Sequence, residues 1–475
     1  MIHPLELLRY RIVVTSYSHL HVEFTRILKF KKAIKEYPKL PKERRGRHPG
    51  RPSLSLLSGL FLDGLARLGR LLVLDEAHTI KNTDSCTYAA VALLRRQFEA
   101  CIMLTGTPLD NTWIDAFALF NLLSGHRIRT MTNMREAFTD PADNMPNRQA
   151  RIPKVHYFTR LVQMMDACTL RRPLKTVQHM LTDLTVELAQ FELPGEELKA
   201  SNDKFRKFWN LFYAGHGNQG SEQAAMTGRR RKKQRMTGFL SFIKAQQMAN
   251  HPMLIEITRL EKRVWISAIE QEDAADLEQV GQKAQRLLEQ WREPLSQNRN
   301  WRSARVDKII DIINRHRDVY QDDVYVIMDE SVYFLDIIKI ALGHTDDPIP
   351  SYTHDVREDP VERDLVLENF QAASGPRALL VSHGTGGVGL NLQCANVLVQ
   401  CGPSWKQSWE EQAVGRIHRP GQTKPVFVYK IQAHACKVEK HKVKWRDQNQ
   451  RVQTRIVNAI TRVDDAQVPQ ARECS

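Results

Sequence analysis

The chain has 475 residues, of which 42% are hydrophobic and 26% are charged. This length exceeds that of one core and predicts two or three domains, and the composition excludes a chain that is disordered throughout. Lys and Arg number 69 against 54 Asp and Glu, so the net charge of +15 suits a polyanionic partner and equally a solvated basic surface.

Cysteine spacing and hydropathy exclude further classes of protein. The seven cysteines form no C-x-x-C pair and show no metal-ligand spacing, so they predict neither a zinc module nor a disulfide framework. No apolar run approaches the ~18 residues of a membrane-spanning helix, and we expect no membrane partner.

The amino-terminal part contains two features of interest. Residues 11–17 (R-I-V-V-T-S-Y) predict a short buried strand that ends in hydroxyl groups. The stretch from Lys29 to Pro52 has ten Lys and Arg, two Glu and repeated prolines, and it predicts a surface insertion. Either a solvated loop or a nucleic-acid contact fits this composition.

The next apolar run ends in two carboxylates. Residues 71–74 (L-L-V-L) lack polar alternation, which predicts a parallel strand that is covered on both faces. Asp75 and Glu76 follow at its carboxyl end, where ligands bind in open α/β sheets. Such a pair can hold Mg²⁺ and orient a water molecule, although an acidic strand end that caps the next helix gives the same pattern.

A second strand follows at residues 101–104, after a helical pattern from Thr87 to Phe98. The order strand, helix, strand predicts a βαβ unit. Thr105, Gly106 and Thr107 lie at the exit of this second strand, next to the carboxylates. Their small side chains suit either a simple turn or a residue set that couples the two strand ends.

Residues from Trp113 to about Asn300 show a mostly helical pattern. The polar segment 214–238 contains six basic residues between Arg229 and Arg235, and we expect it to be disordered. The basic run is compatible with a nuclear import signal, a phosphate patch or plain solvation.

A second α/β unit starts near Ser303. The expected helices cover residues 306–313, 332–342, 363–370 and 437–461, and the expected strands cover residues 324–328, 378–381, 396–399 and 426–429. A glycine-rich loop runs from Ser382 to Leu392, and residues 411–422 place Arg416 and Arg419 at i and i+3, which predicts one helical face. A nucleotide is expected between this arginine-bearing unit and the acidic one.

These motifs, in this order from Ile12 to Tyr429, resemble the Swi/Snf-type branch of helicase superfamily two, the DNA-dependent ATPases of chromatin remodelling and repair. The resemblance implies an α/β fold of two RecA-like parallel-sheet lobes joined by a helical insertion, with the first lobe incomplete. It implies a partial first lobe over residues 1–175, a helical protrusion and linker over 176–300, and a second lobe over 301–475.

The resemblance also implies roles for individual residues, with ATP and Mg²⁺ as cofactors. Asp75 would hold Mg²⁺, Glu76 would polarise the attacking water, and Arg416 and Arg419 would act as arginine fingers. The remaining implied sites are Gly389 and Gln412 for the nucleotide, His78, Thr105, Gly106 and Thr107 for coupling, and Ser382, Thr385, Gly386 and Trp405 for nucleic acid. The implied partner is double-stranded or nucleosomal DNA, gripped by its phosphates, and the implied location is the nucleus.

One motif of the family is missing from the sequence. No G-x-x-x-x-G-K-[ST] occurs, and no Gly is followed by Lys. This loop supplies the backbone cradle and the lysine that bind the phosphates. We therefore expect the chain to be a fragment or a shortened gene product that lacks the amino-terminal part in which this motif lies.

Two functions remain open. The first is an ATP-driven DNA translocase, which the acidic pair and the two arginines favour. The second is a non-catalytic DNA- or protein-binding fragment, which the missing phosphate loop favours.

Overall fold

The computed structural model describes residues 2–39, 47–109, 112–138, 155–171, 178–213, 228–259, 276–297, 300–355, 357, 359–383 and 389–460. The chain divides into two compact units, Met1–Arg172 with Asn449–Ser475 and Pro173–Gln448, which are described separately. The terminal segment from Asn449 groups with the first unit, because Ile456 and Ile460 belong to the cluster of Trp113 and Leu161.

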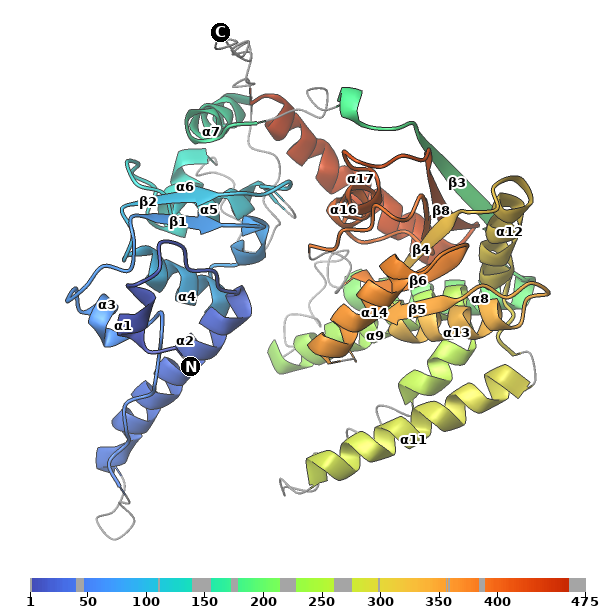
Figure 1. Ribbon diagram of the computed structural model, residues 1–475, viewed down its shortest axis with the longest axis horizontal. Helices are drawn as coiled ribbons and strands as arrows, with labels where there is room; N and C mark the ends of the chain where they lie inside the picture. Colours follow the sequence, from blue (N-terminus) through green and yellow to red (C-terminus); the bar gives the residue numbers. More distant parts are fainter. Residues whose placement is uncertain are drawn as a thin grey trace, which may run out of the picture. The chain divides into compact units, whose positions relative to one another are not determined.

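The first unit is built on a two-stranded parallel sheet of β1 (Leu71–Leu74) and β2 (Ala100–Met103) (Figure 1). The helix α4 (Cys86–Arg95) connects these strands, which confirms the predicted βαβ order. The other elements are α1 (Pro4–Leu7), α2 (Tyr17–Glu36), η1 (Tyr37–Lys39), α3 (Gly59–Leu62), η3 (Ala77–Ile80), η4 (Trp113–Asp115), α5 (Ala116–Phe120), α6 (Met131–Phe138) and α7 (Val155–Cys168).

Three predictions for this unit are wrong. Residues 11–16 form no strand, and Val14 is 90% exposed. The two-stranded sheet offers this segment no hydrogen-bonding neighbour. β1 is covered on one face only, since Leu71 and Val73 are about half exposed. Finally, the solvated-loop alternative for the basic stretch is wrong for residues 29–36, which are helical and continue α2, although their lysine side chains are exposed.

The second unit contains a six-stranded sheet in the order β3-β8-β7-β4-β6-β5, and every neighbouring pair is parallel. The strands are β3 (Leu184–Glu192), β4 (Val324–Asp329), β5 (Ser351–His354), β6 (Arg377–Ser382), β7 (Val397–Gln400) and β8 (Val426–His434). The four strands predicted here are confirmed. β3 lies in the region expected to be helical, and β5 was not predicted.

Helices cover both faces of this sheet. One core joins Tyr325 and Ile327 to α12 (Ala304–Val319) and α13 (Val332–Gly343), while the opposite core joins Val326 to α14 (Pro360–Ala372) and α16 (Gln407–Ile417). Alternate residues of one strand point to opposite faces, so β4 is buried along its whole length. This arrangement confirms the α/β fold class with parallel sheets.

The remaining elements of the second unit are η7 (Gln178–Met180), α8 (Gly195–Tyr213), α9 (Gly228–Asn250), α11 (Asp276–Gln297) and the first part of α17 (Lys437–Asn458). The prediction of disorder is wrong for residues 228–238, which are helical in α9, while residues 214–227 lie outside the described part of the chain. α9 packs along α8 through Phe242 and Phe208. Within the described residues, none of the helices combines the length and hydropathy that crossing a membrane requires.

Candidate active site

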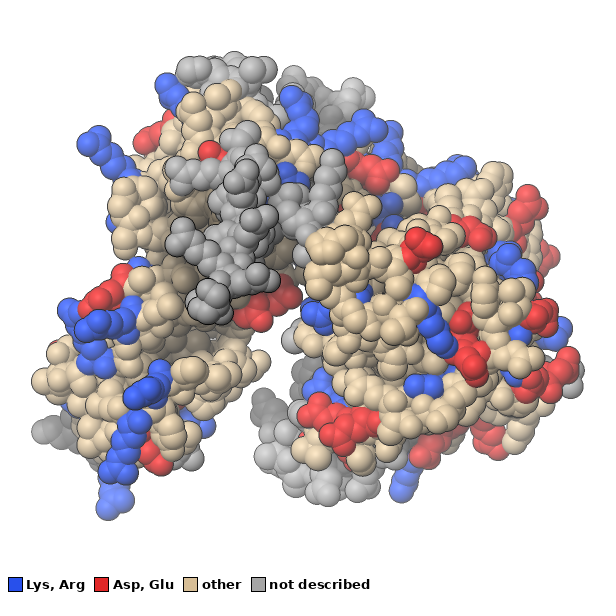
Figure 2. Space-filling view, turned by 45° about the horizontal axis from the view of Figure 1, so that its top comes forward, with Lys and Arg blue, Asp and Glu red and all other residues tan. Residues whose placement is uncertain are grey.

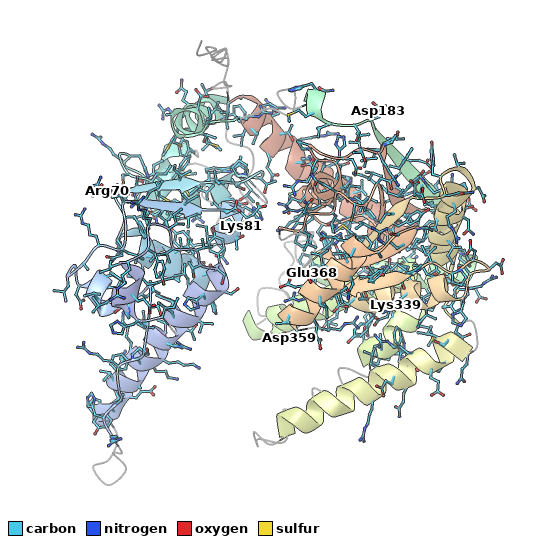
Figure 3. All side chains as sticks on the ribbon, viewed as in Figure 1. Arg70, Lys81, Asp183, Lys339, Asp359 and Glu368 are labelled. Carbon is cyan, nitrogen blue, oxygen red and sulfur yellow. The ribbon has the colours of Figure 1, made fainter. Side chains whose placement is uncertain are left out.

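The acidic pair lies directly after β1, in the turn that leads into η3. In Figure 3, the labelled Arg70 directly precedes β1 and the labelled Lys81 directly follows η3, so the two labels mark the ends of the segment that contains the acidic pair. The main-chain N–H of Glu76 donates to Asp75 Oδ1 at 2.9 Å. Glu76 has φ 46° and ψ 49°, a left-handed conformation that is uncommon for a residue with a side chain and that often marks functional sites. This turn leads the chain from the end of β1 into η3.

The structure brings the acidic pair and the exit of β2 together. Ala77 N donates to Leu104 O at 2.9 Å, which continues the strand pairing beyond β1. His78 Nδ1 lies 3.3 Å from Glu76 Oε2 and 3.4 Å from Thr105 Oγ1. His78 therefore connects the carboxylate of Glu76 to the threonine of the neighbouring strand end.

The two other residues predicted for coupling complete this turn. Thr107 N donates to Thr105 Oγ1 at 3.1 Å, and Gly106 between them is exposed. The Thr107 hydroxyl oxygen is buried and has no hydrogen-bond partner among the described residues.

Tyr17, which the sequence motifs do not single out, also contacts this site. Its phenol donates to the main-chain oxygen of Asp75 at 2.7 Å from the first residue of α2. Burial, followed by the nearby Asp75 carboxylate, raises the pKa of Tyr17 to about 12, so the phenol stays protonated and can donate. Nothing in the local sequence distinguishes this tyrosine, because its partner is 58 residues away.

The donor set at Asp75 suits magnesium. Mg²⁺ is usually bound by one or two protein carboxylates together with water and substrate phosphates. Asp75 is exposed at a strand end, and no group of three or more His, Cys, Asp or Glu in the described part of the chain could hold an ion by itself. These residues fit an ion that takes its other ligands from solvent and a nucleotide.

The arginine pair belongs to the second unit. Arg416 lies in α16, one turn after Gln412, but the helix ends at Ile417 and His418 has non-helical angles. Arg419 therefore follows the helix, and the prediction that both arginines share one helical face is wrong. Gly389, the predicted nucleotide contact, has φ +66° and is exposed.

Two side chains fix the turn after α16. His418 Nε2 lies 2.8 Å from Thr182 O, and Gln422 Nε2 lies within 3.1 Å of the main-chain oxygens of Gln393, Ala395 and Ile417. Gln422 Oε1 in turn accepts from Thr423 N and Lys424 N at 3.0 Å. These bonds position Arg419 in a defined turn even though it lies outside the helix.

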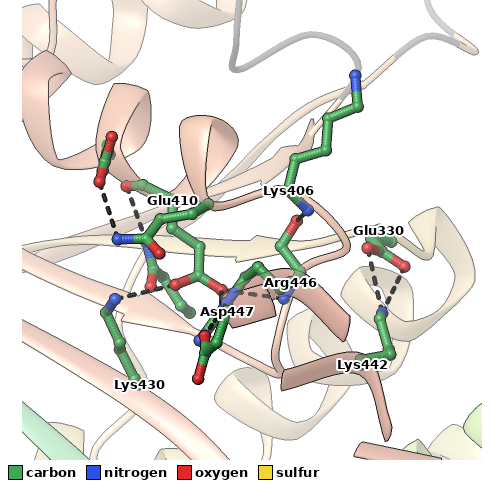
Figure 4. A network of polar contacts seen from close by, with 11 residues as sticks. Glu330, Lys406, Glu410, Lys430, Lys442, Arg446 and Asp447 are labelled. Atoms are coloured by element: carbon green, nitrogen blue, oxygen red, sulfur yellow. Dashed lines mark hydrogen bonds and ion pairs between the residues drawn. The ribbon is translucent and has the colours of Figure 1, made fainter. Parts of the chain in front are cut away.

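A buried carboxylate anchors the helix that carries Arg416. Glu410 is 3% exposed, and its oxygens accept from Arg446 of α17 at 2.5 Å, Lys430 of β8 at 2.9 Å and Ser404 N at 3.0 Å (Figure 4). Gln400 Nε2 also donates to Glu410 O at 3.2 Å. Sequence reasoning missed Glu410, although it lies only two residues before Gln412.

A second buried pair lies beside the end of β4. Lys442 of α17 is 1% exposed and contacts Glu330 at 3.1 Å (Figure 4). Burial, the largest influence, would raise the pKa of Glu330, but the Lys442 ammonium and the Gln246 hydrogen bond, with smaller contributions, together outweigh it and lower the pKa. The carboxyl group of Asp329 is buried, and no described Lys or Arg forms an ion pair with it; burial raises its pKa to about 7. Asp329 and Glu330 line a small pocket with His383.

The residues predicted to contact nucleic acid are only partly described. Ser382 is buried at the end of β6, in register with Asp329, whereas Thr385 and Gly386 lie outside the described residues. Trp405 packs on Phe242, with ring centroids 4.8 Å apart, and on Trp445 at 5.8 Å. Its ring therefore serves in the packing of α9 and α17.

Comparisons with known proteins agree with these motifs. The family described as SNF2-related domain matches residues 3–254, and the helicase conserved C-terminal domain matches residues 304–421. A probable global transactivator of Orgyia pseudotsugata multicapsid polyhedrosis virus is 28% identical over 374 residues, which cover 77% of this chain and 62% of that protein.

Two cellular relatives match a similar share of this chain. Protein CHROMATIN REMODELING 20 of Arabidopsis thaliana is 23% identical over 78% of this chain and 26% of that protein. A RAD54-like DNA repair and recombination protein of Drosophila mojavensis is 24% identical over 78% of this chain and 44% of that protein. The chain thus spans less than two thirds of the length of these relatives. Since the first family match alone covers more than half of its residues, the chain belongs to the SNF2-related family, of Swi/Snf type, and carries a helicase C-terminal domain.

Proposed function

We propose that the protein is an ATP-driven translocase on double-stranded DNA. The observation that carries this proposal is the contact chain from Glu76 through His78 to Thr105. The carboxylate of Glu76 can orient a water molecule, and this chain of contacts connects it to the exit of the adjacent strand, β2. A change at the nucleotide can therefore move the neighbouring loop, as a translocating ATPase requires.

Each unit would contribute its own residues to the reaction. Asp75 would hold Mg²⁺, which neutralises phosphate charge when bound, and Glu76 would orient the attacking water. His78, Thr105, Gly106 and Thr107 would couple this site to the DNA path. In the second unit, Arg416 and Arg419 would stabilise the charge on the transferred phosphoryl group, and Gln412 and Gly389 would contact the nucleotide.

The DNA contacts would come from Ser382, Thr385, Gly386 and Trp405. Phosphate contacts carry no base information, so binding would be largely independent of sequence. The names of the relatives support a role in chromatin remodelling or DNA repair. We propose that this role is carried out on naked or nucleosomal DNA in the nucleus. We also propose the three-part division into residues 1–175, 176–300 and 301–475 as the functional layout.

A second function is favoured by one observation. The sequence contains no G-x-x-x-x-G-K-[ST], so it lacks the usual lysine and backbone cradle for the phosphates. A DNA- or protein-binding role without ATP turnover would need neither. Under this alternative, the second unit and its arginines would serve binding alone.

Phosphate release in the presence of duplex DNA tests the proposed reaction. We expect DNA-stimulated hydrolysis by the wild type and a loss of about 10²-fold or more in Glu76→Gln, because a group that orients the attacking water is removed. Glu99→Gln, a change at an exposed glutamate of the same unit, is the matched control and should retain full turnover. Equal turnover in Glu76→Gln and the wild type would contradict the assignment.

A further inference from the structure

A basic arm extends from the first unit, formed by residues 26–39 at the end of α2 and in η1. Figure 1 shows α2 running away from β1 and β2. The arm contains a single acid, Glu36, against six cations: Arg26, Lys29, Lys31, Lys32, Lys35 and Lys39. All six cations are exposed. Positive side chains gather on this unit in Figure 2 as well.

The base of the arm is firmly attached to the core. The buried carboxylate of Glu23 accepts from the main-chain N–H groups of Ser55 and Leu57 at 2.8 Å and of Leu56 at 3.1 Å. Leu20 and Ile27 are buried on the same face of α2. These contacts hold the first half of the helix, so the charged half is presented on a fixed support rather than on a loose loop.

The lysines of the arm have little compensation within the protein. Lys29, Lys32 and Lys35 follow one another at intervals of three residues, so consecutive lysines are neighbours on the surface of α2, and Lys29 and Lys32 lie opposite Leu20 and Ile27. Among the described residues, Lys29, Lys31 and Lys35 make no ion pair, and Lys32 contacts Glu36 only at 3.9 Å. Like charges at i, i+3 and i, i+4 destabilise a helix, and an anionic partner would relieve this repulsion.

We propose that the basic arm binds the phosphate backbone of a nucleic-acid duplex. A protein partner would need aromatic or large apolar anchors at its centre. Leu28, at 41% exposure, is the one exposed large apolar side chain in the arm. A cluster of exposed lysines instead suits the phosphates of a duplex, which it binds without reading the sequence.

This contact differs from the nucleic-acid contacts proposed above, because Ser382 and Trp405 belong to the second unit. It also requires no ATP turnover, so it can hold whether or not the protein hydrolyses ATP. The arm therefore gives the first unit a DNA-binding surface of its own.

Fluorescence anisotropy with a labelled DNA duplex of arbitrary sequence, titrated over a range of salt concentrations, tests the proposal. The full chain is compared with the triple variant Lys29→Ala, Lys32→Ala, Lys35→Ala. The matched control removes three exposed lysines from α8, at Lys199, Lys204 and Lys207. A third variant changes the three arm lysines to Arg, which keeps the charge.

We expect the arm variant to bind more weakly. Its salt dependence, the slope of log K against log salt, should fall by about 0.9 for each phosphate that the variant no longer binds. The α8 variant and the arginine variant should keep the wild-type slope, and no variant should melt below the wild-type temperature.

Three results would overturn the proposal: an unchanged slope in the arm variant, an equal weakening in the α8 variant, or no duplex binding by the wild type. DNA binding that depends on the arm without ATP hydrolysis would contradict the translocase and leave the arm assignment intact.

Discussion

The phenol of Tyr17 donates a hydrogen bond to the main-chain oxygen of Asp75 at 2.7 Å. This bond ties the first residue of α2 to the turn that presents the acidic pair. It supports the strand end from outside the sheet, at a point where β1 has one face exposed. The orientation of Asp75 and Glu76 thus depends on a residue outside the recognised motifs.

Tyr17→Phe tests this support. Loss of one hydrogen bond should lower the free energy of unfolding by about 0.5–1.5 kcal/mol, measured by urea denaturation. DNA-stimulated ATP turnover should fall several-fold, because the Asp75 turn is less well held. Tyr10→Phe, at an exposed tyrosine, is the control and should change neither quantity. Wild-type turnover in Tyr17→Phe would show that the bond has no part in the reaction.

Glu410→Gln tests the anchor of α16. The change leaves Lys430 and Arg446 without their buried counter-charge, and breaking such a pair costs about 3–5 kcal/mol when one partner is removed. We expect a clear drop in the melting temperature, while Glu411→Gln, one residue further and exposed, should melt like the wild type.

The same variant also reports on Arg416. If Glu410 acts by positioning the helix that carries this arginine, Glu410→Gln should lower kcat in the wild-type background and add little in an Arg416→Ala background. Equal fold-losses in both backgrounds would mean that Glu410 acts independently of Arg416.

Glu23→Gln tests the base of the basic arm. Its carboxylate is fully buried and accepts three main-chain N–H groups, so the neutral amide would place a donor against donors. A loss of about 1–3 kcal/mol in the free energy of unfolding is expected. Glu36→Gln, at an exposed position of the same helix, should leave stability within about 0.5 kcal/mol of the wild type. Similar stabilities for the two variants would show that the hydrogen bonds of Glu23 do not hold the base of the arm.

The raised pKa of Asp329 predicts a pH dependence of stability. The folded-state pKa of about 7 lies above the ordinary value of 3.8, so the carboxyl binds its proton more tightly when folded. The stability from this group is fully present below about pH 4 and is lost as the pH rises through 7. Asp329→Asn keeps a neutral group, so its stability relative to the wild type should increase between pH 5 and 8, measured by thermal unfolding. A difference that stays constant, or falls, over this range would contradict a buried neutral carboxyl.

The sequence predicted best where burial was complete. β4, β6 and β7 are buried along their whole length and have apolar centres, and their expected bounds agree with the structure to within two residues. It failed at residues 11–16, which have strand-like composition but no neighbouring strand to pair with. Apolar composition shows that a strand is possible, whereas hydrogen-bond partners decide whether it forms.

The residues of the site were predicted where strand order alone brings them together, and were missed or misplaced where the contacts of the folded chain decide their position. The motifs brought Glu76, His78 and Thr105 together because they lie at the ends of two adjacent parallel strands. Arg419 was placed on a helix because spacing alone does not show that the helix ends at Ile417. Tyr17 and Arg446 were missed because their partners are distant in sequence, and only the folded chain reveals them.

DNA-stimulated ATP hydrolysis by the full chain, with and without Arg416, tests the central claim most directly. The translocase assignment predicts that duplex DNA raises the turnover of the wild type and that Arg416→Ala removes about 10³-fold or more of it, the range known for arginine fingers. Arg315→Ala, at an exposed arginine of α12, is the matched control and should retain wild-type turnover. No hydrolysis by the wild type, or hydrolysis that Arg416→Ala leaves unchanged, would contradict the claim.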